Sequence, residues 1–121
     1  MAQDQPVLPP AIDRFIAAVN AFDGDALLEP FVDDALVNDN KREFWGKEAI
    51  KKFTDRDFIG DRVTMAVTDV RTHYGLVIVA AKVDGTYDKT NLPDPLILTF
   101  YFTLQGDKIA TLLILLNKPV S

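Results

Sequence analysis

The chain has 121 residues, of which 48% are hydrophobic and 26% are charged. This length fits one domain with its own core and excludes a two-domain dinucleotide enzyme or a βα-barrel of about 250 residues. The sequence has no cysteine, which excludes a disulfide scaffold and a Cys nucleophile, and its one histidine, His73, excludes a site that needs two imidazoles. The net charge of -5 argues against a nucleic-acid or anionic membrane surface.

The first ten residues contain neither a basic region nor an apolar run, so no secretory leader is predicted. The longest apolar stretches, 76–81 and 112–116, are much shorter than the roughly 20 residues of a membrane-spanning helix. We therefore expect a cytoplasmic protein with a short tail over residues 1–8 and one domain over residues 9–118.

Helices are predicted in the first half of the chain. Pro9 and Pro10 suit a helix start, and the apolar face that follows is formed by Ile12, Phe15, Ile16 and Val19. This helix should end near residues 23–24. A short helix over 25–31 is ended around Pro30, a brief strand covers 35–37, and a third helix covers 47–53, before a turn at 58–61.

Strands are predicted in the second half, over residues 63–68, 76–83, 96–104 and 109–116. Turns are expected at 74–75, 91–95 and 105–108. Helices followed by an antiparallel meander indicate an α+β fold in which the helices cover one face of a curved sheet.

The last two predicted strands carry apolar side chains on both faces. Because the helices can cover only one face, the other face exposes an apolar patch, and such patches usually mark an interface. We therefore expect a homodimer formed through the outer face of the sheet, with Tyr101, Leu113 and Leu115 in the contact.

Four segments in order, 14–20, 31–37, 46–50 and 106–109, resemble the NTF2-like superfamily, especially its SnoaL-like and ketosteroid-isomerase-like branches. The resemblance extends from about Pro9 to Asn117. It implies a cone-shaped α+β fold in which three N-terminal helices pack on a curved, mainly antiparallel sheet and enclose an apolar pocket. Dimerisation through the outer sheet face is common in this superfamily and agrees with the patch described above.

The resemblance also implies a candidate catalytic residue. In the isomerase branch a carboxylate base follows the strand that corresponds to residues 33–37, which places it at Asp39 in this sequence. A carboxylate in that position shuttles a proton beside a substrate carbonyl. The alternative is that Asp39 belongs to a polar turn over residues 37–41, where Asp and Asn are ordinary residues.

The sequence departs from the isomerase branch at its two oxyanion donors. The corresponding positions hold Phe15 and Leu98, which cannot donate a hydrogen bond, so a ketosteroid-isomerase mechanism is not expected. Both positions become apolar lining instead. The predicted pocket residues are Phe15, Val19, Trp45, Phe53, Phe58, Met65, Tyr87, Leu98, Phe100, Leu112 and Ile114.

Other residues offer weaker signals. Asn20, Asn38, Trp45 and Tyr87 are possible polar helpers of Asp39, whereas His73 is expected at a strand edge. No phosphate-binding loop, metal-ligand spacing or nucleophile elbow occurs in the sequence, so we expect no cofactor and no metal.

The prediction is a SnoaL-like dimer that binds a small apolar molecule, with acid/base chemistry of an isomerase or cyclase type at Asp39. The alternative is a binder without catalysis or a dimeric assembly module.

Overall fold

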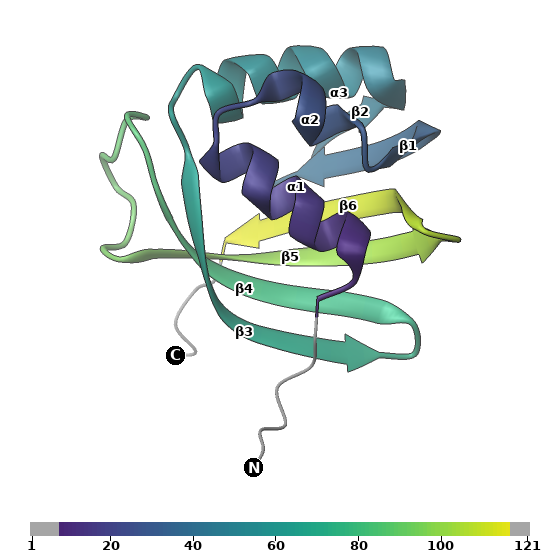
Figure 1. Ribbon diagram of the computed structural model, residues 1–121. Coiled ribbons are helices and arrows are strands. Elements are labelled where there is room, and N and C mark those ends of the chain that lie inside the picture. Colours follow the sequence, from purple (N-terminus) through teal and green to yellow (C-terminus); the bar gives the residue numbers. More distant parts are fainter. Residues whose placement is uncertain (1–7, 117–121) are drawn as a thin grey trace.

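The computed structural model describes residues 8–116 and shows helices packed on one face of a strongly curved sheet (Figure 1). The predicted boundary between the tail and the domain, at residues 8–9, lies at the start of this range. The predicted end of the domain, at residue 118, lies outside the described residues. The helical elements are α1 (Pro10–Asn20), α2 (Gly24–Leu28), α3 (Gly46–Thr54) and the π-helical turn η1 (Asp55–Ile59). The strands are β1 (Phe31–Asp39), β2 (Arg42–Trp45), β3 (Thr64–His73), β4 (Leu76–Asp84), β5 (Leu96–Gln105) and β6 (Lys108–Leu116).

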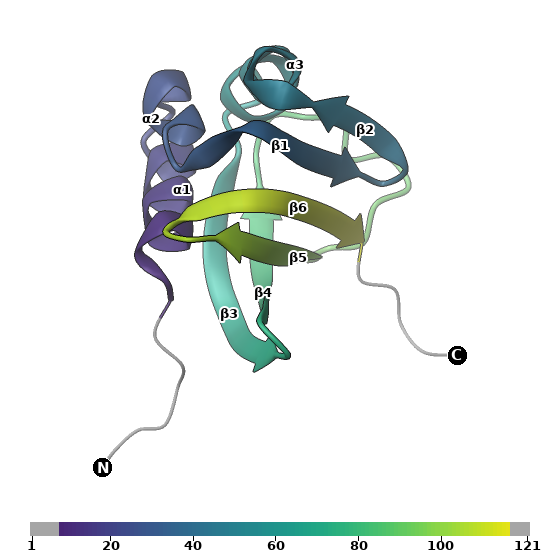
Figure 2. The same cartoon turned by 90° about the vertical axis from the view of Figure 1, so that its right-hand side faces the viewer.

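The six strands form one sheet in the order β2-β1-β6-β5-β4-β3. All neighbouring pairs are antiparallel except β1 and β6, which run parallel side by side (Figure 2). The prediction of an α+β fold with a curved, mainly antiparallel sheet is confirmed. None of the helices within residues 8–116 has the length and apolar character needed to cross a membrane.

Three details of the predicted element order are corrected. The predicted strand at 35–37 is the middle of the longer β1, and Phe31, expected at a helix end, begins that strand and is fully buried. Strand β2 was not predicted, because it has only four residues and three of them are exposed. Two strands, β1 and β2, separate α3 from the first two helices, whereas only the short strand at 35–37 was predicted there.

The first helix forms as its sequence pattern predicts. Pro9 precedes it and Pro10 occupies its first turn, where no amide donor is required. Its buried residues lie on one face and are Ala11, Ile12, Phe15, Ile16, Ala18 and Val19. Helix α2 is started by Asp23, whose carboxylate accepts a hydrogen bond from the Ala26 amide at 3.1 Å.

The end of α3 widens into the π-helical turn η1. The Thr54 hydroxyl donates to the Ile50 carbonyl at 2.9 Å, a back-bond that often bends helices, and the Gly60 amide then donates to the Asp55 carbonyl at 2.8 Å. Gly60 is required here, because a Cβ would lie 2.6 Å from the Arg56 carbonyl oxygen. Such π-turns occur frequently at functional sites.

Among residues 8–116, the inner face of the sheet packs against the helices, and the outer face does not. On the inner face, alternate residues of β4, β5 and β6 are buried, as in the series Val77, Val79, Ala81 and Val83. On the outer face, Ile78 lies opposite Tyr101, and Tyr101 lies opposite Leu113. Leu115 is 37% exposed on the same face. We call Ile78, Tyr101, Leu113 and Leu115 the outer apolar band.

An aromatic cluster centred on Phe15 fills the space between α1 and the sheet. The Phe15 ring meets the rings of Phe31 at 5.8 Å, Phe102 at 5.7 Å and Phe58 at 6.4 Å, each nearly edge to face. Phe53 meets Phe58 at 5.6 Å. These contacts join α1, β1, β5 and the end of α3 into one core.

Candidate functional site

The inner face of the sheet leaves a cavity of about 490 Å³ that is partly open to solvent. Its wall comes from the ends of β1 and β6, the start of β5, the end of β4, η1 and the loop over residues 85–95. The apolar lining residues are Phe58, Val63, Val83, Leu92, Leu96, Leu98, Phe100, Ile114 and Leu116. The polar lining residues are Asp39, Asn40, Arg42, Asp57, Asp61, Tyr87 and Asp88.

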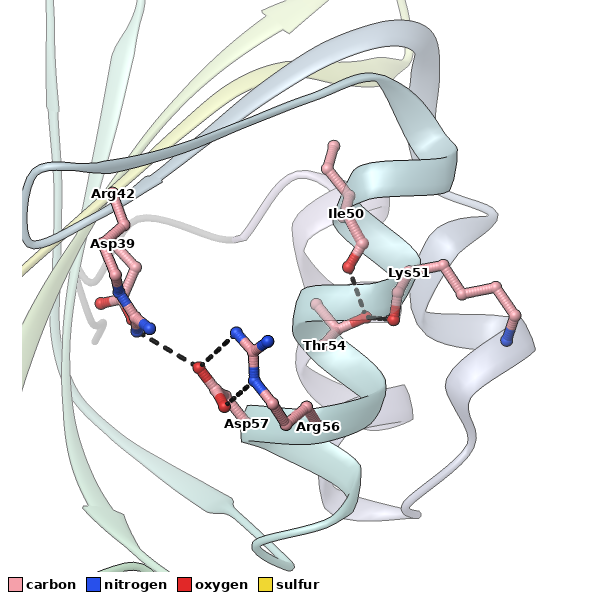
Figure 3. Close-up of polar contacts among 7 residues, drawn as sticks. All are labelled: Asp39, Arg42, Ile50, Lys51, Thr54, Arg56 and Asp57. Carbon is pink, nitrogen blue, oxygen red and sulfur yellow. Dashed lines mark hydrogen bonds and ion pairs between the residues drawn. The ribbon is translucent and has the colours of Figure 1, made fainter.

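An ion-pair network crosses one side of the cavity mouth. Arg42 Nη2 donates to Asp39 Oδ2 at 2.6 Å and to Asp57 Oδ2 at 3.2 Å. Arg56 Nε reaches the other oxygen of Asp57 at 2.8 Å. Figure 3 shows the two arginines approaching the Asp57 carboxylate from opposite elements, β2 and η1. The network therefore ties the β1–β2 hairpin to the end of the third helix.

Both carboxylates in this network are mostly buried, with side chains 25% exposed. Partial burial raises the pKa of Asp57, but hydrogen bonds and charge from Arg56, followed by those from Arg42, outweigh this and hold the pKa below its ordinary value. The guanidinium of Arg42 also lies 5.8 Å from the Phe44 ring centroid and 5.7 Å from that of Phe53. Arg42 is thus fixed by both charge and aromatic contacts.

Tyr87, in the loop that follows β4, also lines the cavity with its phenol. Its hydroxyl donates to the Val83 carbonyl at 3.2 Å. Burial, followed by the negative charge of Asp84, raises the pKa of Tyr87, so the phenol stays protonated at neutral pH. Its one proton is engaged with the Val83 carbonyl, and its oxygen can still accept a hydrogen bond.

The predicted site residues occupy three different environments. Asp39, Phe58, Tyr87, Leu98, Phe100 and Ile114 line the cavity. Five others lie in the buried core and do not line it: Phe15, Val19, Phe53, Met65 and Leu112. Trp45 differs most from its expected place, since it is 62% exposed at the end of β2, with its indole N–H donating to Glu43.

The predicted polar helpers Asn20 and Asn38, and the one histidine, have structural roles away from the cavity. The Asn20 side chain bonds both the amide and the carbonyl of Met65, at 2.7 and 3.0 Å, and fastens α1 to β3. Asn38 accepts from the Lys41 amide in the β1–β2 turn. His73 packs on Tyr74 at an exposed strand end. None of these three residues lines the cavity.

Sequence reasoning missed Arg42, Asp57, Asp61 and Asp88. Asp57 and Arg42 are 15 residues apart and meet only because η1 turns Asp57 towards the β1–β2 hairpin. The one available signal was the alternation of basic and acidic residues around the third helix, which is equally typical of a solvated face. Within residues 8–116, no three acidic or histidine side chains are grouped closely enough to hold a metal ion.

No family model matches the chain, and no curated protein matches it. Solved structures do. A candidate polyketide cyclase from Sinorhizobium meliloti is 28% identical, with 89% of this chain and 95% of that chain covered and a TM-score of 0.79. A protein of ketosteroid isomerase-like fold from Catenulispora acidiphila, in complex with trimethylamine, is 18% identical, with 90% and 86% covered and a TM-score of 0.77.

Two further solved structures also match the chain. The orange carotenoid protein of Anabaena (Nostoc) sp. PCC 7120, which binds canthaxanthin, is 21% identical; 97% of this chain and 39% of that chain are covered, with a TM-score of 0.74. An NTF2-like protein of Cytophaga hutchinsonii is 13% identical, with 96% and 95% covered and a TM-score of 0.73.

The Asp57 ion pairs predict a pH-dependent stability. Because the folded pKa of Asp57 is depressed, its contribution is complete above about pH 5 and is lost as pH falls through its ordinary pKa towards the folded value. Asp57→Asn should therefore reduce the loss of unfolding free energy between about pH 5 and pH 3, measured by urea titration. Asp34→Asn, at an exposed β1 position, is the control and should leave that slope unchanged. Equal slopes for all three proteins would contradict the prediction.

Proposed function

We propose that this chain, which has the NTF2-like fold, binds a small, mainly apolar molecule in the cavity on the inner face of its sheet. The observation that carries the proposal is the cavity itself, with nine apolar lining residues behind a polar mouth. Apolar walls with a few convergent polar groups are typical of small-molecule sites, and this volume lies in the range such sites occupy. The matched carotenoid protein, whose ligand is apolar, supports the same conclusion.

The charges at the mouth favour a neutral or cationic ligand. Four carboxylates line the cavity, those of Asp39, Asp57, Asp61 and Asp88. Among residues 8–116, Arg42 is the one cationic lining residue, and it is already paired with Asp39 and Asp57. An anion entering the cavity meets an excess of like charge at low local dielectric, which opposes its binding.

A second candidate function, proton transfer, is favoured by the placement of Asp39 and Arg42. The Asp39 carboxylate lines the cavity, and the Arg42 guanidinium lies 2.6 Å from it. In this reaction Asp39 takes a proton from the carbon beside a ligand carbonyl, Arg42 stabilises the enolate oxygen, and Asp39 returns the proton. Arg42 then provides the hydrogen-bond donor for the enolate oxygen. Phe15 and Leu98, which occupy the donor positions of the isomerase branch, cannot donate a hydrogen bond.

We also propose that two copies of the chain associate through the outer apolar band. Tyr101 and Leu113 are half-buried neighbours, Leu115 is 37% exposed, and no helix among residues 8–116 covers this face. Burial of these side chains against a second copy removes an apolar surface from water. Such a dimer leaves the cavity accessible, because the cavity is on the inner face.

Ligand binding is tested with prodan, a neutral naphthalene ketone whose fluorescence shifts to the blue in apolar surroundings. We expect saturable binding to the unaltered protein. Leu98→Trp fills the cavity and should weaken binding at least about tenfold. Leu104→Trp changes the same strand outside the cavity and should bind normally. The anionic dye 1-anilinonaphthalene-8-sulfonate should bind more weakly than prodan, and salt should reduce the difference. Undiminished binding by Leu98→Trp would refute this site.

Proton transfer is tested with 2-tetralone in deuterium oxide, by NMR detection of deuterium uptake beside the carbonyl. We expect the protein to accelerate uptake and Asp39→Asn to remove about 100-fold or more of the acceleration, because the base is lost. Prodan binding should persist in this variant. Asp61→Asn, which alters another lining carboxylate, should retain activity. No acceleration by the unaltered protein would leave binding alone as the function.

Dimerisation is tested by light scattering after size exclusion. We expect twice the mass of one chain at micromolar concentration. Leu113→Lys places a charge in the outer apolar band and should give a monomer, because an unpaired charge in an apolar interface is costly. Thr72→Lys adds the same charge at an exposed position of β3 and should stay dimeric. A monomeric unaltered protein would overturn the proposed dimer.

A further inference from the structure

A second cavity, of about 510 Å³, lies beside the first. It is formed by the end of β4, the start of β5 and the loop over residues 85–95 that joins them. Four charged residues line it, Lys82, Asp84, Lys89 and Asp94, and Pro93 and Pro95 add apolar surface. Figure 1 shows this loop projecting from the end of the sheet where β4 leaves it and β5 begins.

The two cavities share part of their wall. Val83, Tyr87, Leu92 and Leu96 line both of them. Val83 and Leu96 are buried and face each other across the β4–β5 ladder, so their positions are fixed by the sheet. Tyr87 and Leu92 are half-buried side chains of the connecting loop. The separation between the cavities therefore depends on these two loop side chains.

The two side chains are held to different degrees. Tyr87 is anchored by its hydrogen bond to the Val83 carbonyl, by Lys89 Nζ at 5.6 Å from its ring centroid, and by close packing over Gly85. The start of the loop is pinned where Thr86 donates two hydrogen bonds to the Asp61 carbonyl, at 2.7 and 3.1 Å. Leu92 makes only apolar side-chain contacts, and its backbone amide reaches Lys89 at 3.2 Å. Of the two loop side chains that separate the cavities, Leu92 is therefore the less constrained.

We infer that the two cavities are compartments of one elongated binding site and that Leu92, beside Tyr87, limits the length of ligand that the site accepts. The inference rests on the proposed ligand-binding function. The ligand class it indicates has a compact apolar head in the first cavity and an unbranched chain directed past Leu92 towards Pro93 and Pro95. Lys82 and Asp84, on the strand side of the second cavity, suit a polar end of that chain.

The test uses prodan and its hexanoyl and lauroyl homologues, which carry the same fluorophore on progressively longer chains. In the unaltered protein, affinity should stop rising once the chain fills the first cavity. In Leu92→Ala it should continue to rise, by about three- to fourfold for each further methylene that leaves water. Adding Lys82→Trp to Leu92→Ala fills the second cavity from its strand side and should cancel that gain. Leu104→Ala, a half-buried leucine outside both cavities, should behave as the unaltered protein.

Leu92→Phe tests the same wall in the opposite direction. It enlarges the side chain, so the result does not depend on whether the fold tolerates the smaller alanine. The substitution thickens the wall between the two cavities and should weaken binding of the long homologues by a larger factor than binding of prodan. Thermal unfolding followed by circular dichroism checks that each variant is folded. If prodan binds but the chain-length profile is the same in all variants, the inference is wrong and the proposed function stands. If prodan does not bind the unaltered protein, the proposed function fails and the inference fails with it.

Discussion

The edge-to-face packing of aromatic rings around Phe15 determines where the inner face of the sheet leaves a cavity. Phe15 brings α1 against Phe31 of β1 and Phe102 of β5, and it meets Phe58 at the end of the third helix. The rings fill the part of the inner face that α1 covers. The remaining space lies on the far side of Phe58, which contributes one face to the core and lines the cavity as well. The cavity thus occupies the part of the inner sheet face that the aromatic cluster does not fill.

The ion pairs of Arg42 add a second constraint, on the shape of the cavity mouth. A three-way contact with Asp39 and Asp57 holds a short edge hairpin against a π-turn. Exposed ion pairs contribute little to stability, but here the carboxylates are mostly buried and the arginine also contacts two aromatic rings. Arg42 therefore orders the mouth and offsets part of the negative charge of the carboxylates around it.

The sequence was sufficient for the fold class, since helical spacing predicts α1 and α3. Alternation predicts β3, and apolar runs predict the three strands that follow it. The resemblance to the NTF2-like superfamily is confirmed at the level of the fold. It also singled out Asp39, which local pattern alone assigns to a turn. Arg42 and Asp57 could not be predicted, because their meeting depends on the widened turn at Asp55–Ile59 and on through-space charge pairing. Trp45 was misplaced because its large apolar side chain suggested burial, whereas β2 is an exposed edge strand.

The parallel pairing of β1 with β6 has a consequence for the order in which this protein is assembled. Asp39 lies beside Ile114, a residue synthesised 75 positions later, and nearly the whole domain must emerge before β1 finds this neighbour. Contacts of such sequence separation form late, because chain-closure entropy must be overcome first. A ribosome-bound fragment that ends before β6 therefore lacks both the neighbour of β1 and the part of the cavity wall that Ile114 and Leu116 form.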